Sequence, residues 1–161
     1  MLKFTDYMVT FREVPDEISL CINISNCPNR CLGCHSKELW EDIGEELTDE
    51  KLCSLIERNE GITCICFMGG DSDPKRVEEL CKLVKTKYPF LLTCWYSGKK
   101  ENSIDLSCLD YLKLGPYIEQ LGGLDCPTTN QRFYEIELSR STDTNYNPEY
   151  GLIDITDKFW K

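Results

Sequence analysis

The chain has 161 residues, enough for one domain with a single core, and we expect one continuous domain over residues 1–161. Its net charge of −10 argues against binding bare nucleic acid or anionic lipid, because like charges repel. The sequence has no apolar run of about 18 residues, and its first ten residues lack the apolar core of a signal peptide, so we expect a cytoplasmic protein.

The first predicted elements alternate between strands and helices. Apolar residues at alternate positions predict a short strand over residues 20–25. Thr48 follows as the expected N-cap of a helix, whose apolar stripe contains Leu52, Leu55 and Ile56. Residues 62–68 then predict a buried strand that ends in a Gly-Gly-Asp turn.

A second helix is expected to begin at Asp73 and Pro74, with apolar residues at helical spacing, namely Val77, Leu80, Cys81 and Val84. Further strands are expected at residues 91–95 and 111–114, with weaker candidates at 136–138 and 152–155. This alternation favours right-handed crossovers and a mostly parallel sheet. A complete β/α barrel needs roughly 200 residues or more. We therefore expect an α/β fold in the form of a partial (incomplete) β/α barrel.

Three of the eleven cysteines fall within eight residues, at Cys27, Cys31 and Cys34. A loop of this size can bind a cubic 4Fe–4S cluster through three thiolates, which leaves the fourth iron open to a substrate. The alternative is zinc with His35 as the fourth ligand. Structural zinc sites often use two separated pairs of ligands, and His35 directly follows a cysteine, so the spacing favours the cluster.

The other eight cysteines are scattered, and we expect most of them to be thiols in a reducing compartment. Cys64 and Cys66 should share one face of their strand, where a second metal site would need more ligands nearby. Because parallel sheets bind ligands at the carboxyl ends of their strands, the cysteine loop, residues 69–71 and residues 95–98 should converge on one edge.

The cysteine spacing, placed after a strand, resembles that of the radical S-adenosylmethionine superfamily. The chain is also similar, over nearly its whole length, to the anaerobic ribonucleoside-triphosphate reductase-activating proteins, in residues 23–36, 39–40, 67–71, 115–117, 129–132 and 154–160. Gly33 departs from the aromatic residue usual in the superfamily before the third cysteine, although His35 follows that cysteine. Ser36 stands where many of these activators have Asn.

The resemblance implies a 4Fe–4S cluster that binds S-adenosylmethionine through its open iron. One electron from the reduced cluster would cleave the sulfonium C–S bond, giving methionine and a 5′-deoxyadenosyl radical. That radical would remove a hydrogen atom from a glycine of the partner, the glycyl radical subunit of anaerobic ribonucleoside-triphosphate reductase. A flavodoxin- or ferredoxin-type protein would donate the electron. An incomplete barrel suits a protein substrate, because the glycine of another chain must reach the radical.

With this resemblance, the expected cofactor-binding residues are Gly33, His35, Gly69, Gly70, Asp71, Trp95, Tyr96 and Ser97. The turn at residues 69–71 fits the methionine amino group, since glycine allows close backbone approach; the alternative is an ordinary turn with a solvated aspartate. Residues 95–97 would line the ribose and adenine, or else pack in the core. His35 would stack on adenine or bond a cluster sulfur, or else pack at the surface.

Two other functions stay open. The chain could be a different small radical enzyme, either an activase of another glycyl radical enzyme or a 7-carboxy-7-deazaguanine synthase-like protein. It could also be a non-catalytic iron–sulfur electron-transfer module, in which four protein ligands would fill the cluster. Near the C-terminus, Phe159 and Trp160 are candidates for a partner-docking patch or for a lid over the sheet.

Overall fold

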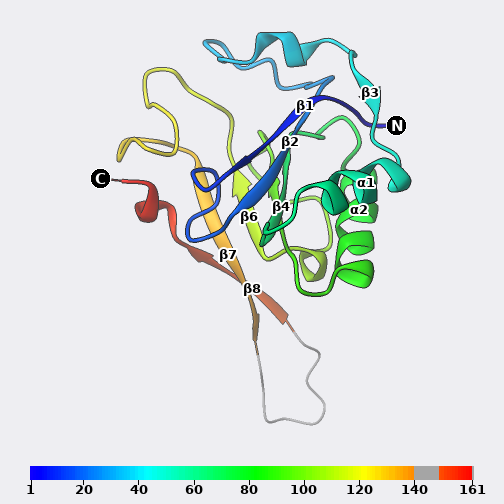
Figure 1. Ribbon diagram of the computed structural model, residues 1–161. Helices are drawn as coiled ribbons and strands as arrows, with labels where there is room; N and C mark the ends of the chain where they lie inside the picture. Colours follow the sequence, from blue (N-terminus) through cyan, green and yellow to red (C-terminus); the bar gives the residue numbers. More distant parts are fainter. Residues whose placement is uncertain (140–148, 161) are drawn as a thin grey trace.

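The computed structural model describes residues 1–139 and 149–160, and these form an α/β fold on one eight-stranded sheet (Figure 1). The strands are β1 (Lys3–Thr10), β2 (Ser19–Ile24), β3 (Glu45–Glu46), β4 (Cys64–Met68), β5 (Leu92–Tyr96), β6 (Tyr111–Leu114), β7 (Arg132–Ser139) and β8 (Glu149–Asp154). The helices are α1 (Asp49–Arg58) and α2 (Pro74–Lys87), with 3-10 turns η1 (Lys37–Trp40), η2 (Leu106–Cys108) and η3 (Thr156–Phe159). No helix in this part of the chain has the length and apolar character needed to traverse a bilayer.

The strand order is β3-β1-β2-β4-β5-β6-β7-β8. The central strands β2, β4, β5 and β6 are parallel, as predicted, whereas β1 and β3 on one flank and β7 and β8 on the other are antiparallel. The prediction of a mostly parallel sheet is therefore wrong for the flanks. β1 returns directly into β2 through residues 11–18, a connection too short for a crossover helix. Within the described residues the sheet is open, with β3 and β8 as edges, and the partial barrel stays a prediction.

Both helices begin where their capping residues predict. The Thr48 side chain accepts a hydrogen bond from the Lys51 amide at 3.0 Å, and Asp73 accepts one from the Arg76 amide at 3.2 Å. β6 also has the predicted limits, and the other central strands shift by one or two residues. β1 and β3 were not expected, and both β7 and β8 begin earlier than predicted.

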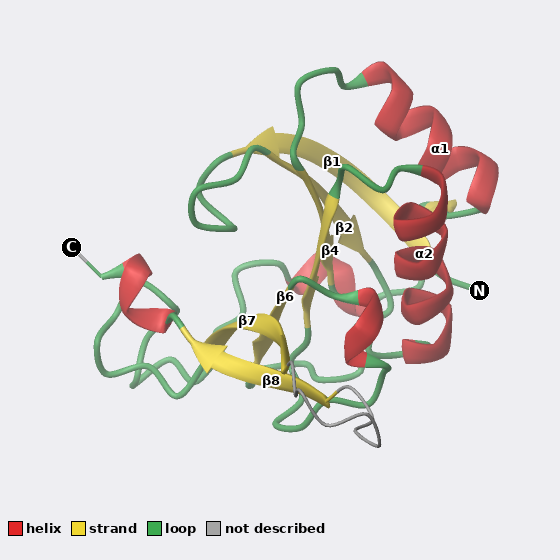
Figure 2. Cartoon of the chain, turned by 90° about the horizontal axis from the view of Figure 1, so that it is seen from below, coloured by secondary structure: helices red, strands yellow, loops and turns green. Residues whose placement is uncertain are grey.

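The two faces of the sheet are covered differently. Figure 2 shows both helices on one face, where they enclose the main core. The opposite face carries a smaller apolar cluster that includes Cys21, Cys64, Cys66 and Cys94, together with Val14 and Phe133. Cys64 and Cys66 thus share a face, as predicted, and both are fully buried. Burial raises the pKa of Cys66 well above its ordinary value, so this thiol keeps its proton.

The cap at Thr48 offers a direct test of the helix assignment. Thr48→Ala removes the acceptor of the Lys51 amide and should lower the free energy of unfolding by about 1 kcal/mol. The matched control is Thr86→Ala, an exposed position in the last turn of α2, where alanine has the higher helix propensity. Chemical denaturation of both variants measures the difference. An equal effect at the two positions would contradict the capping role.

Candidate metal centre

Cys27, Cys31 and Cys34 lie on the loop between β2 and η1, at the carboxyl ends of the parallel strands (Figure 1). The start of this loop is fixed by main-chain hydrogen bonds to the segment that follows it. The Asn26 amide donates to the Glu41 carbonyl, and the Cys27 amide donates to the Leu39 carbonyl, both at 2.9 Å. The loop therefore folds back on itself and forms a closed lobe that carries the three thiols.

The path of the lobe depends on left-handed backbone conformations at Asn26, Arg30 and Gly33. Gly33 has a φ of +81°, and a Cβ atom there would lie 3.0 Å from the Glu119 carboxyl group. A larger residue would be strained and would press on Glu119. The backbone conformation of Gly33 and the closeness of Glu119 therefore explain why this chain has glycine where an aromatic residue is usual.

All three thiols are free and partly exposed, and two of them receive hydrogen bonds from nearby donors. The Ser36 amide donates to Cys34 Sγ at 3.4 Å, and the Asn29 side-chain amide donates to Cys27 Sγ at 3.7 Å. Donors directed at sulfur stabilise thiolate ligands and tune the potential of an iron–sulfur cluster. Three accessible thiols on one lobe, with such donors in place, fit a cluster held by three cysteines.

Among the described residues, no three Cys, His, Asp or Glu side chains are positioned to bind one metal ion together. Two thiolates on a single tetrahedral zinc ion lie about 3.8 Å apart, given Zn–S bonds of about 2.3 Å. A cubic cluster has no such requirement, since each thiolate binds a different iron. Around Cys64 and Cys66, too, the described residues form no group of three potential metal ligands.

Asp71 connects the lobe to the ends of two strands. Its carboxylate accepts hydrogen bonds from Asn29 Nδ2 at 2.6 Å, from Ser97 Oγ at 2.5 Å and from the Gly98 amide at 2.8 Å. Only 9% of Asp71 is exposed, so it is not the solvated aspartate of an ordinary turn. A carboxylate has about four acceptor positions, so one remains for a further donor.

The two glycines before Asp71 fix the turn after β4. Gly69 and Gly70 have φ angles of +108° and +103°. A Cβ at Gly70 would lie 2.5 Å from Val77 Cγ2 on α2, so only glycine allows the helix to pack this close. The Gly69 carbonyl accepts a hydrogen bond from Trp95 Nε1 at 2.9 Å. These residues bring the turn and the cysteine lobe together at the edge that the sequence predicts.

Residues 95–97 occupy three different environments. Trp95, expected to line the ribose and adenine, is instead fully buried in the main core under the helices, where it supports the Gly69 carbonyl. Ser97 is also buried and bonds Asp71. Tyr96 is half-buried on the opposite face, and its hydroxyl donates to the Glu13 carbonyl. Only Tyr96 of the three has side-chain surface available to a ligand.

His35 lies at the outside of the lobe and is exposed. Its ring packs against the Tyr117 ring, with centroids 5.6 Å apart and planes inclined by 56°. This contact joins the lobe to the segment after β6. Packing at the surface is therefore part of its role, and the expected contacts with adenine or a cluster sulfur stay predictions.

Lys113 is a site residue that the sequence pattern does not single out. It lies in β6 with 8% of its surface exposed, and its Nζ donates to the Gly115 carbonyl at 2.8 Å and the Ser97 carbonyl at 3.3 Å. Burial lowers its pKa to about 8, while Asp71 and the three lobe thiols act in the opposite direction. Ser97 connects the two charged side chains, since its carbonyl accepts from Lys113 and its hydroxyl donates to Asp71. The sequence signal that could have identified Lys113 as a site residue is its position in an otherwise apolar strand.

In a comparison with models of protein families, residues 18–121 match the 4Fe-4S single cluster domain. The matched range covers well over half of the chain and contains the cysteine lobe, Asp71 and Lys113. Neither the curated proteins nor the solved structures gave a significant match.

Asp71→Asn should loosen the connection between the lobe and the strands. An amide offers one acceptor oxygen instead of two, so at least one donor among Asn29, Ser97 and Gly98 loses its partner. The free energy of unfolding of the cluster-free protein should fall by about 2 kcal/mol. The control Asp42→Asn alters an exposed ion pair with Lys3 and should change it by less than about 1 kcal/mol. Equal stability of the Asp71 variant and the wild type would remove its connecting role.

The lowered pKa of Lys113 predicts a pH effect of definite sign. The folded protein releases this proton near pH 8, whereas the unfolded chain keeps it to about pH 10.5. Across this window the stability of the wild type should therefore rise relative to that of Lys113→Met, in which the contributions of the buried thiols are the same. Relative to the variant, the cluster-free wild type should gain up to ~3 kcal/mol in free energy of unfolding. Lys100→Met, at an exposed position, is the control, and a pH-independent difference between wild type and Lys113→Met would refute the burial.

Proposed function

The chain belongs to the 4Fe-4S single cluster domain family, and on this premise we propose that it is a radical S-adenosylmethionine activase. It cleaves S-adenosylmethionine reductively and generates a glycyl radical on an anaerobic ribonucleoside-triphosphate reductase. The observation that carries the proposal is the convergence of three lobe cysteines with a buried carboxylate and a buried cation at one sheet edge. A domain that only stores or transfers electrons has no need of such a paired site beside its cluster.

Cys27, Cys31 and Cys34 would hold the cluster, and because the lobe supplies no fourth cysteine, a position would be left for S-adenosylmethionine. When bound and reduced, the cluster supplies the electron that splits the sulfonium of S-adenosylmethionine into methionine and the 5′-deoxyadenosyl radical that attacks the glycine. The protein's own contribution is to hold the cofactor, orient it and exclude water.

The amino acid part of S-adenosylmethionine is a zwitterion, and the site offers a matching pair of charges. Asp71 keeps one acceptor position for the ammonium group, with the backbone of Gly69 and Gly70 beside it. Lys113 provides the cation for the carboxylate group. At a pKa of about 8 this lysine is still largely protonated at neutral pH. Both groups are buried, so each interaction is stronger than it would be in water.

The adenosine part would lie toward Tyr96, His35 and Gly33, with Ser97 and Trp95 behind them as supports of the Asp71 and Gly69 positions. In this proposal the parallel centre of the sheet serves as the incomplete barrel. Its open side admits the partner's glycine. A flavodoxin- or ferredoxin-type protein in the cytoplasm reduces the cluster.

Anaerobic reconstitution with iron and sulfide tests the ligand assignment. Alanine at Cys27, Cys31 or Cys34 should abolish both the cluster absorbance and the formation of 5′-deoxyadenosine after reduction with dithionite. Cys126→Ala, a partly exposed cysteine outside the lobe, is the matched control and should retain both. A cluster that forms in the wild type without cleaving S-adenosylmethionine would favour the electron-transfer module. Retention of activity in any lobe variant would end the assignment.

The partner is tested separately with the reduced, reconstituted protein. Incubation with S-adenosylmethionine and the anaerobic reductase should produce the doublet signal of a glycyl radical in electron paramagnetic resonance. A doublet that appears only with a different glycyl radical enzyme would reassign the partner. Deoxyadenosine formation that is stimulated by a small purine precursor, without any protein radical, would favour the deazaguanine synthase alternative.

A further inference from the structure

Away from the cysteine lobe, the two packed helices bring a thiol and an amine into contact. Lys87 Nζ donates a hydrogen bond to Cys53 Sγ at 3.4 Å. Cys53 lies in α1, and Lys87 is the last residue of α2, 34 positions later in the chain. The helices lie side by side on one face of the sheet (Figure 2), and this packing creates the pair.

Helix electrostatics alone do not explain where the lysine points. Lys85 and Lys87 both lie in the last turn of α2, where a cation favourably opposes the helix dipole. Lys85 pairs with the carboxylate of Asp110, the usual kind of partner for an ammonium group. Lys87 instead directs its Nζ at sulfur, with the centre of the Tyr88 ring 5.9 Å away. Glu57, one turn after the cysteine, accepts from the Tyr88 hydroxyl at 2.9 Å.

Cys53 is more accessible than the other buried cysteines. Its exposed fraction is 8%, whereas the six other buried cysteines are no more than 2% exposed. Lys87 and Glu57, on either side of the sulfur, are both exposed. A small oxidant can therefore reach this thiol from the surface of the helices. A reachable thiol beside a lysine is the kind of environment in which cysteine oxidation is site-selective.

We propose that hydrogen peroxide joins Cys53 to Lys87 through a sulfur–nitrogen bond, which makes a reversible cross-link between α1 and α2. In the first step the sulfur attacks the peroxide, so that an S–O bond forms and the O–O bond breaks. The hydroxide that leaves takes the thiol proton and becomes water. Sulfur gives up the two electrons that reduce the peroxide, and Cys53 becomes a sulfenic acid.

The second step needs no further oxidant. The Lys87 ammonium releases one proton to solvent, and its nitrogen attacks the sulfenic sulfur. The N–S bond forms as the S–O bond breaks, and the leaving hydroxide takes a second proton from nitrogen as water. Sulfenic acids condense in this way with a nearby nitrogen to give a sulfenamide. The nitrogen is already held beside the sulfur, which favours this reaction over further oxidation to the irreversible sulfinic acid.

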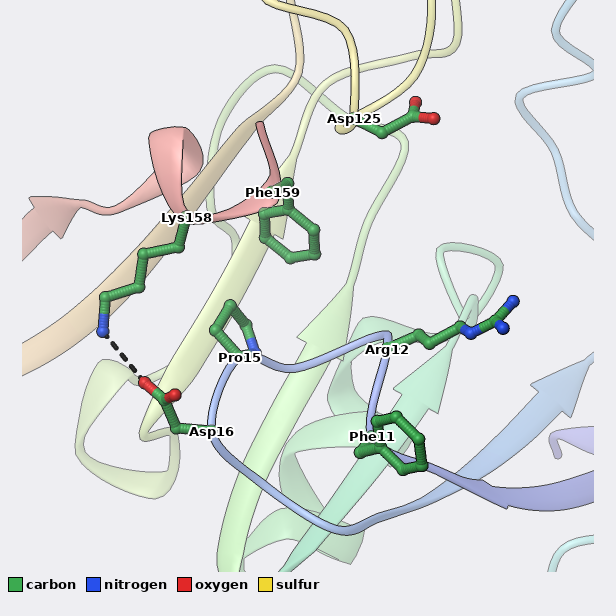
Figure 3. Close-up of a pocket in the computed structure, with 7 residues that line it drawn as sticks. All are labelled: Phe11, Arg12, Pro15, Asp16, Asp125, Lys158 and Phe159. Carbon is green, nitrogen blue, oxygen red and sulfur yellow. Dashed lines mark hydrogen bonds and ion pairs between the residues drawn. The ribbon is translucent and has the colours of Figure 1, made fainter. Parts of the chain in front are cut away.

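The pair lies apart from the metal centre and from a hollow on the other face of the sheet. Lys87 comes shortly before β5, at the amino ends of the parallel strands, whereas the lobe lies at their carboxyl ends. The hollow has a volume of about 910 Å³, and most of its lining comes from the loop between β1 and β2 and from η3 (Figure 3). Neither Cys53 nor Lys87 lines it. The cross-link is therefore independent of the proposed function.

Peptide mapping by mass spectrometry tests the cross-link in the full, cluster-free chain. After treatment with hydrogen peroxide, the remaining thiols are alkylated and the protein is digested with trypsin without reductant. A product should join residues 52–58 to residues 86–99, because a modified Lys87 resists trypsin. Its mass should be lower by two hydrogen atoms than the sum of the two peptides. Dithiothreitol should separate them again.

Lys87→Arg keeps the positive charge but removes the primary amine, so it should abolish the joined product and leave Cys53 as sulfinic acid. Lys75→Arg, at an exposed position near the start of α2, is the matched control and should form the product as the wild type does. Both positions are at the surface, and circular dichroism should show both variants folded. Detection of Cys53 in the wild type only as thiol, sulfenic or sulfinic acid would overturn the proposal.

Thermal unfolding provides a second readout. A cross-link between positions this far apart restricts the unfolded chain, as a disulfide does. The midpoint of unfolding after peroxide treatment should therefore be about 5–10 °C higher in the wild type than in Lys87→Arg. Dithiothreitol should remove this difference. Equal midpoints before and after reduction would contradict a bond between the two helices.

Discussion

The candidate site depends on one buried carboxylate. The Asp71 carboxylate accepts hydrogen bonds from the cysteine lobe, from Ser97 and from the Gly98 amide, and Lys113 Nζ donates to the carbonyl of the same Ser97. The lobe follows β2, residues 97–98 follow β5, and Asp71 itself follows β4, so without this carboxylate these segments would share an edge but not a fixed arrangement. The carboxylate can be buried because three hydrogen bonds and a neighbouring cation offset its loss of hydration.

The centre of the fold could be predicted because its signals are local. The caps at Thr48 and Asp73 lie beside their helices, and the buried central strands are short apolar runs between turns. The flanks lacked such signals. In β1 only Phe4 is fully buried, and every residue of β8 is exposed, so neither shows an alternation between a buried and an exposed face. Their positions follow from pairing with neighbouring strands instead.

The same distinction explains which parts of the site could be found in the sequence. The three lobe cysteines are close together in the chain, so their spacing alone indicates a shared ligand. Lys113 reaches the site only through the register of β6. For Trp95, in contrast, the local sequence signal led to a wrong prediction. Its position directly before Tyr96 and Ser97 suggested a cofactor contact, but alternation along β5 turns its ring into the opposite core.

The separation of the cysteines into two environments has a consequence for cluster assembly. Eleven thiols compete for incoming iron, and soft metals do not distinguish one free thiolate from another. The four on the sheet face are enclosed by apolar side chains and hold their protons, which makes them poor competitors. If the lobe holds the cluster as proposed, the burial of these four thiols would favour metal binding at the lobe as much as the accessibility of the lobe itself would. The packing of the second apolar cluster thus keeps four cysteines from competing for iron.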